Sequence, residues 1–184
     1  MKGLILFDID KTLIKSSTGH AAAFSVGFKE VYNIYSTIDI INPHGMTDQQ
    51  IIIEVLKKKG LKESEIQPKI KECMKVMLDY FDEIKDSIHI EILDGVIELL
   101  EELKKQNFLI GLVTGNLEPI GRGKLEKAGL NQYFKLGGFG SDDINRTKLV
   151  KIAIKRAEEN FDFIQDNNIF LFGDAPQDMK AGNE

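Results

Sequence analysis

The most informative stretch of the sequence lies near the start of the chain and reads Gly3-Leu4-Ile5-Leu6-Phe7-Asp8-Ile9-Asp10-Lys11-Thr12. Its first five residues form a short continuous apolar run, which fits a strand buried on both faces of a parallel sheet. From Asp8 onward, polar residues take over. The stretch therefore predicts a strand that delivers two carboxylates, Asp8 and Asp10, at its C-terminal end. That end is the edge at which open α/β sheets bind their ligands.

Two later segments repeat this pattern. The apolar residues 108–113 are followed by Thr114-Gly115-Asn116, and the apolar residues 168–172 are followed by Gly173-Asp174. Helical periodicity fills the intervals, so we predict helices after Asp94 as N-cap, over 119–128 with Gly129 at C′, over 147–160 and over 175–182. The alternation of strands and helices predicts an α/β fold with a doubly wound parallel sheet. Such a sheet would place a further strand after 175–182, so the sequence leaves open whether the chain is cut short after Glu184.

Residues 17–89 interrupt this alternation. They contain no convincing buried strand and show helical patterns over 21–32, 48–59 and 63–84, with Gly60 and Pro68 as punctuation. We therefore predict an α/β core domain made of residues 1–16 and 90–184, and a helical domain of residues 17–89 inserted after the first strand.

Composition excludes several classes of function. The 184 residues include 24 basic and 29 acidic side chains, a net charge of −5, which argues against nucleic acid as a main partner. No apolar run is long enough to span a membrane. A single cysteine, Cys73, excludes an internal disulfide framework and a zinc site of several cysteines. We expect a reduced, cytoplasmic protein, by default a monomer.

Four acids are candidates for chemistry. Asp8 and Asp10 end one predicted strand, and Asp174 and Asp178 follow another. Crowded carboxylates repel one another unless a divalent cation neutralises them or one stays protonated as a general acid. An all-oxygen set of this kind suits Mg²⁺ better than zinc or copper. The alternative interpretation is a solvated turn for the first pair and a favourable helix start for Asp178.

Other residues could bind an anion beside these acids. The hydroxyl, glycine and amide of Thr114-Gly115-Asn116 could hold phosphate oxygens, although a plain strand-to-helix loop would look the same. The candidates for a basic partner are Arg146, Lys148 and Lys124. The three histidines, His20, His44 and His89, are scattered, and we interpret them as ordinary polar residues, with only His44 bordering a motif.

Taken together, these stretches resemble the four motifs of the haloacid dehalogenase (HAD) superfamily in their usual order. The inserted helices resemble a C1 cap, as in phosphoglycolate phosphatase and β-phosphoglucomutase. Within them, His44-Gly45-Met46-Thr47-Asp48 is similar to a Gly-Met-Thr-Asp stretch of some caps. Two features depart from the pattern: Lys11 replaces the usual glycine, and the common Lys-Pro of the third motif is absent. Counting back from the apolar helix at Ile152 makes Arg146 the best match for the third motif.

The resemblance implies roles for these residues. Asp8 would attack phosphorus to form an aspartyl-phosphate, and Asp10 would protonate the leaving alcohol and then deprotonate water. Asp8, Asp174 and the carbonyl of Asp10 would bind Mg²⁺, with Asp178 in support. Thr114 and Arg146 would hold the phosphoryl oxygens. Further substrate-binding residues are expected at Thr12, Gly115, Asn116 and Lys148 in the core and at Gly45, Met46 and Thr47 in the cap.

The resulting expectation is a Mg²⁺-dependent phosphatase that acts on a small phosphorylated metabolite, similar to phosphoglycolate phosphatase. A β-phosphoglucomutase-like phosphosugar mutase would use the same machinery, and a degenerate HAD fold could serve as a binding module without catalysis. A dehalogenase fits less well, because such members need no metal and a second acid suits alcohol protonation. A nucleotide-binding Rossmann domain lacks its Gly-x-Gly-x-x-Gly motif. The natural substrate cannot be read from the sequence.

Overall fold

The core of the molecule is a parallel sheet of four strands. The structure, a computed structural model, describes residues 2–15, 18–164 and 168–177. The strands are β1 (Leu4–Phe7), β2 (Leu109–Thr114), β3 (Leu136–Phe139) and β4 (Ile169–Phe172), in the order β3-β2-β1-β4. All neighbours pair in parallel, with Leu4 opposite both Leu109 and Ile169. This arrangement confirms the predicted α/β fold and places β1 in the interior of the sheet.

The strand β3 is not apparent from the pattern of apolar residues. Its residues read Leu-Gly-Gly-Phe, so two glycines interrupt the apolar pattern that revealed the other strands. These glycines are needed for packing, because a Cβ on Gly138 would lie 2.0 Å from the carbonyl oxygen of Leu149. The absence of a side chain therefore lets the following helix approach the sheet closely.

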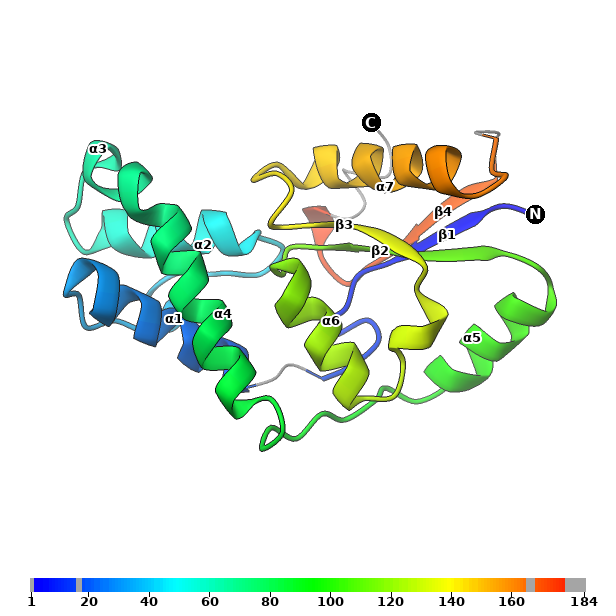
Figure 1. The fold of residues 1–184 in the computed structure, drawn as a ribbon, viewed down its shortest axis with the longest axis horizontal. Coiled ribbons are helices and arrows are strands. Elements are labelled where there is room, and N and C mark those ends of the chain that lie inside the picture. Colours follow the sequence, from blue (N-terminus) through cyan, green and yellow to red (C-terminus); the bar gives the residue numbers. More distant parts are fainter. Residues whose placement is uncertain (1, 16–17, 165–167, 178–184) are drawn as a thin grey trace.

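Helices cover both faces of the sheet (Figure 1). On one face, α7 (Arg146–Asn160) packs Leu149 and Ala153 against Leu4 and Leu6. On the other face lie α5 (Val96–Lys105) and α6 (Glu118–Lys127), with a short 3₁₀ turn, η3 (Asn131–Tyr133), after α6. Gly95, at φ +79°, occupies the N-cap of α5, so the predicted Asp94 cap is wrong. Gly129 follows the C-cap of α6 at φ +69°, as predicted.

The segment between β1 and α5 is helical, as predicted, and lies to one side of the sheet (Figure 1). Its elements are α1 (Thr18–Tyr32), η1 (Ile38–Ile40), α2 (Asp48–Lys58), α3 (Glu63–Ile66), η2 (Gln67–Lys69) and α4 (Ile70–Ile84). The helix predicted over 63–84 is divided at Pro68, which has no N–H for a continuous helix. Phe24, Phe28 and Ile52 belong to an apolar cluster that also includes Leu117 and Ile120 at the start of α6. We refer to residues 18–89 as the helical insert.

The chain leaves the sheet and returns to it at adjacent points. Lys15 donates its backbone N–H to Glu91 at 2.8 Å, and Leu93 donates to Leu13 at 3.1 Å. The insert also contacts the sheet domain directly, because Thr47 Oγ1 donates to the carbonyl of Ile144 at 3.1 Å and Gln49 Nε2 donates to that of Gly140 at 2.6 Å. These contacts place the N-terminus of α2 above the C-terminal edge of the sheet.

None of the helices that the structure describes is long and apolar enough to cross a membrane. Most of the helix predicted over 175–182 lies outside the described residues, since residues 178–184 are not among them.

Candidate active site

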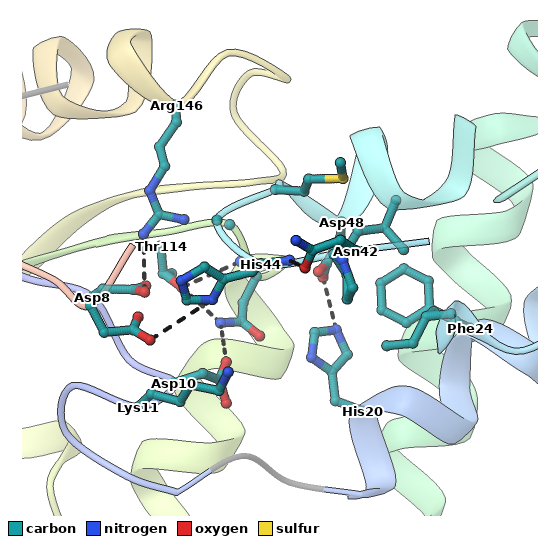
Figure 2. A pocket seen from close by; sticks show the side chains of 18 residues that line it. Asp8, Asp10, Lys11, His20, Phe24, Asn42, His44, Asp48, Thr114 and Arg146 are labelled. Carbon is teal, nitrogen blue, oxygen red and sulfur yellow. Dashed lines mark hydrogen bonds and ion pairs between the residues drawn. The ribbon is translucent and has the colours of Figure 1, made fainter. Parts of the chain in front are cut away.

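A cavity of about 240 Å³ lies between the C-terminal edge of the sheet and the helical insert. Figure 2 shows acids and cations approaching it from the sheet side, and His20, Phe24, Asn42, His44 and Asp48 from the insert. The sheet domain contributes eight residues to the lining: Asp8, Asp10, Lys11, Thr114, Gly115, Asn116, Arg146 and Asp174. The predicted convergence of residues that follow different strands is therefore seen in the structure.

Asp8 directly follows β1, and its position is fixed from both sides. Its N–H donates to the carbonyl of Phe172 at 2.9 Å, which holds the ends of β1 and β4 together. Its carboxylate lies 3.0 Å from Nη2 of Arg146, the first residue of α7, and the two side chains are only 9% and 7% exposed. A buried carboxylate requires such a partner, so Arg146 stabilises the charge of Asp8 at the cavity wall (Figure 2).

Asp10 lies in the turn after β1. Lys11, the residue that replaces the usual glycine, has φ +62°, in the left-handed region. That conformation explains why a glycine is common there, and it costs a lysine about 1 kcal/mol. The tight turn brings the Asp10 carboxyl back toward the cavity that Asp8 lines.

Lys124 on α6 is the buried partner of Asp10. Its Nζ donates to Oδ1 and Oδ2 of Asp10 at 2.9 and 2.8 Å and to Oδ1 of Asn116 at 2.8 Å. The Lys124 side chain is 1% exposed and that of Asp10 28% exposed. Burial acts to raise the pKa of Asp10, but the charge of Lys124, the nearby His20 and the hydrogen bonds from Lys124 and Asn116 together outweigh it, so the pKa of this carboxyl lies below its usual value.

Thr114 and Asn116 form a small network at the end of β2. Asn116 donates through Nδ2 to Thr114 Oγ1 at 2.7 Å and to Asp10 Oδ2 at 2.9 Å. The Asn116 amide thus contacts Asp10, Thr114 and Lys124 and holds these neighbours in place, and Asn116 also lines the cavity. Thr114 Oγ1 accepts from Asn116, and a hydroxyl that accepts can still donate its own proton to a ligand in the cavity.

The acids of the site suit Mg²⁺. Asp8 and Asp174 direct carboxylates into the same cavity, and Asp174 lies 3.9 Å from His44 Nδ1. Among residues 2–15, 18–164 and 168–177, no cluster of three or more metal-binding side chains is present. Two carboxylates suffice for this ion, because Mg²⁺ keeps several waters and is commonly bound by one or two carboxylates together with substrate phosphate. Asp178, the fourth predicted acid, lies outside the described residues.

Other predicted substrate-binding residues have structural roles or lie elsewhere. Thr47 caps α2 and is fully buried, and Lys148 pairs with Asp143 at 3.0 Å with its side chain 61% exposed, so neither lines the cavity. Thr12 Oγ1 is buried outside the cavity lining and has no hydrogen-bond partner among the described residues. The structure therefore places Thr12, Thr47 and Lys148 outside the lining of this cavity.

Gly45, Met46 and Gly115 do line the cavity. A Cβ on Gly115 would lie 2.3 Å from the carbonyl oxygen of Met46, and Asp48 donates its N–H to the carbonyl of Gly115 at 2.8 Å. The absence of a side chain at Gly115 therefore allows the backbone of the insert to approach, whereas the sequence suggested the approach of a ligand.

Sequence analysis missed His20 and Asp48. His20 Nδ1 lies 3.0 Å from Lys124 Nζ, and its Nε2 lies 3.0 Å from Asp48 Oδ2, so it is not an ordinary surface residue. A signal was available: His20 precedes Phe24 and Phe28 at intervals of four, which places it on the buried face of α1. Its ring packs 5.1 Å from that of Phe24.

Solved structures share this fold. CbbY from Rhodobacter sphaeroides, in complex with phosphate, aligns with a TM-score of 0.76 and 15% identity over 100% of this chain and 82% of its own. A haloacid dehalogenase-like family protein from Streptococcus pneumoniae gives 0.65 and 18% over 98% and 80%. An archaeal β-phosphoglucomutase from Pyrococcus sp. strain ST 04 gives 0.57 and 20% over 98% and 82%. At these identities the likeness shows the fold alone.

Similarity in sequence is found at the level of the family. No curated protein sequence matches the chain significantly. The model of the family described as haloacid dehalogenase-like hydrolase matches residues 5–184, which is nearly the whole chain. This match confirms the resemblance seen in the motifs: the chain belongs to the haloacid dehalogenase-like hydrolases.

Proposed function

We propose that the protein is a Mg²⁺-dependent phosphatase that hydrolyses a small phosphomonoester through an aspartyl-phosphate on Asp8. The observation that carries this proposal is the convergence of Asp8, Asp10, Thr114, Arg146 and Asp174 on one cavity of about 240 Å³. Phosphoryl transfer depends mainly on positioning and charge neutralisation, and this set of residues offers both.

In the first step, Asp10 takes up a proton from solvent once the substrate is bound and gives it to the leaving oxygen, while Asp8 attacks phosphorus. In the second step, Asp10 takes a proton from the water that hydrolyses the acyl phosphate. Arg146 and the hydroxyl of Thr114 hold the phosphoryl oxygens, since both line the cavity beside Asp8. Asp8, Asp174 and the carbonyl of Asp10 would hold Mg²⁺, which neutralises charge on the phosphoryl group when bound.

The helical insert acts as a cap over this site, and we place the boundary between cap and core domain at residues 16–17 and 89–90. Its support is the pairing of residues 13–15 with 91–93, which lets the insert leave and rejoin the core at one place. The cap supplies Phe24, Asn42 and His44 to the cavity wall. These side chains would surround the leaving group and exclude bulk water.

A panel of phosphorylated metabolites, including phosphoglycolate, tests this function. We expect release of inorganic phosphate with Mg²⁺ and a rate at least about 100-fold lower in EDTA, restored by added Mg²⁺, because several kcal/mol of charge stabilisation are lost with the metal. Hydrolysis that EDTA does not change would contradict the proposed metal dependence. Formation of an isomer without net phosphate release would instead identify a phosphomutase.

A further inference from the structure

Lys124 connects the sheet domain to the insert through a buried set of hydrogen bonds. A lysine ammonium has three protons and no lone pair. Around Nζ lie three acceptor groups: the carboxylate of Asp10, Oδ1 of Asn116 and Nδ1 of His20. The first two belong to the sheet domain, but His20 belongs to α1 of the insert. When the insert packs against the sheet domain, it therefore supplies the third hydrogen-bond acceptor for a lysine that is only 1% exposed.

The same contacts define the tautomer of His20. Because Lys124 can only donate, Nδ1 must accept, and the ring proton lies on Nε2. Nε2 then donates to Asp48 Oδ2 at 3.0 Å (Figure 2). Asp48 is 2% exposed, and its Oδ2 also accepts the N–H of Leu117 at 2.8 Å. Both ring nitrogens of His20 are thus held, one by Lys124 and the other by an anchored carboxylate.

We propose that His20 is a positioning residue for proton transfer: through Lys124 it holds the Asp10 carboxyl in the geometry that serves the leaving alcohol. This inference rests on the proposed phosphatase function and deepens it. Without His20, one proton of a buried ammonium loses its acceptor, and Nζ must move to recover one. Since Nζ contacts both oxygens of Asp10, such a movement displaces that carboxyl as well.

The step that would suffer is the first one. As the bond from Asp8 to phosphorus forms and the bond from phosphorus to the ester oxygen breaks, Asp10 passes to that oxygen a proton that it takes up from solvent once the substrate is bound. An alkoxide is a poor leaving group and needs this proton, whereas a nitrophenolate leaves readily without it. A defect in positioning the acid should therefore depend on the leaving group, while a loss of folded enzyme should not.

Two esters of similar size provide the test, p-nitrobenzyl phosphate and p-nitrophenyl phosphate, assayed with Mg²⁺. The quantity compared is the ratio of their kcat/KM values in each variant, because the fraction of folded enzyme cancels in this ratio. In His20→Gln the side-chain amide takes the position of Nε2, which faces Asp48. No acceptor then stands at the position of Nδ1, which faces Lys124. In His20→Asn the amide oxygen takes the place of Nδ1. Asp10→Asn gives the ratio expected when the acid is lost altogether.

We expect His20→Gln to lower kcat/KM for the benzyl ester by about 10- to 100-fold and for the phenyl ester by at most about threefold, a fraction of what a general acid contributes. His20→Asn should retain most activity on the benzyl ester, and His89→Gln, a change of an exposed histidine outside the cavity lining, should match the wild type. An equal loss on both esters in His20→Gln, or His20→Asn no better than His20→Gln, would overturn the inference. Wild-type hydrolysis of the phenyl ester alone would overturn it too, whereas hydrolysis of neither ester would contradict the proposed function itself.

Discussion

Asp8→Asn is expected to abolish phosphate release, with kcat at least about 10⁴-fold below that of the wild type. An amide oxygen is not a competent nucleophile, and removal of the group that forms the covalent intermediate usually costs several orders of magnitude. The substitution is nearly isosteric, and the amide oxygen of the new side chain can still accept a hydrogen bond from Arg146, so the fold should persist. The measurement is Mg²⁺-dependent turnover of p-nitrophenyl phosphate, with circular dichroism to check folding.

Asp79→Asn is a suitable control for this variant. Asp79 is an exposed acid on α4 outside the cavity lining, so its substitution removes the same charge without touching the site. It should keep wild-type activity. A folded Asp8→Asn protein that retains more than about a hundredth of the wild-type kcat would remove Asp8 from the role of nucleophile.

Lys124→Met is expected to lower the free energy of unfolding by about 3 kcal/mol, because it leaves a largely buried carboxylate without its cation. The size of this loss follows from the burial of Lys124 and from its contacts with Asp10 and Asn116. Urea denaturation near neutral pH measures it. Lys127→Met is the matched control on the same helix, since the exposed Lys127 only donates to the carbonyl of Asp86, and it should cost less than about 1 kcal/mol.

The stability of this pair also depends on pH in a defined direction. The pKa of Asp10 lies below its ordinary value in the folded protein, so its contribution is fully present above about pH 4 and is lost as pH falls through the lower folded-state pKa. The difference in unfolding free energy between wild type and Lys124→Met should be constant from about pH 8 to about pH 5 and shrink at lower pH. A difference that grows on acidification, or equal losses in Lys124→Met and Lys127→Met, would contradict the assigned pair.

Much of the architecture could be predicted because its signals are local. β1, β2 and β4 are continuous apolar runs, and polar residues follow each of them at the same edge of the sheet. β3 carries no such signal, because close packing against α7 requires glycine where an apolar side chain would have marked a strand. Similarly, Gly95 and not Asp94 begins α5, since the chain turns there in a left-handed conformation.

The site was only partly predictable, because its cross-connections join residues far apart in the sequence. Lys124 was one of three candidate cations, but its burial on the inner face of α6, together with Ile120 and Leu125, was not predicted. The sequence could not show which cation pairs with which acid. Arg146 pairs with Asp8, and Lys124 pairs with Asp10, which is 114 residues away from it in the sequence. Likewise, the spacing of His20 and Phe24 indicates burial but does not reveal that His20 contacts Lys124 on α6.

The central claim is that Asp8 carries the phosphoryl group during turnover. Its most direct test is to quench the enzyme with acid during steady-state hydrolysis of p-nitrophenyl phosphate with Mg²⁺, and to locate the acid-stable phosphoryl group by peptide mass spectrometry. We predict a phosphorylated peptide containing residues 3–12, modified at Asp8 and absent from Asp8→Asn. Phosphorylation at another residue, or efficient turnover in which this peptide never becomes labelled, would contradict the mechanism.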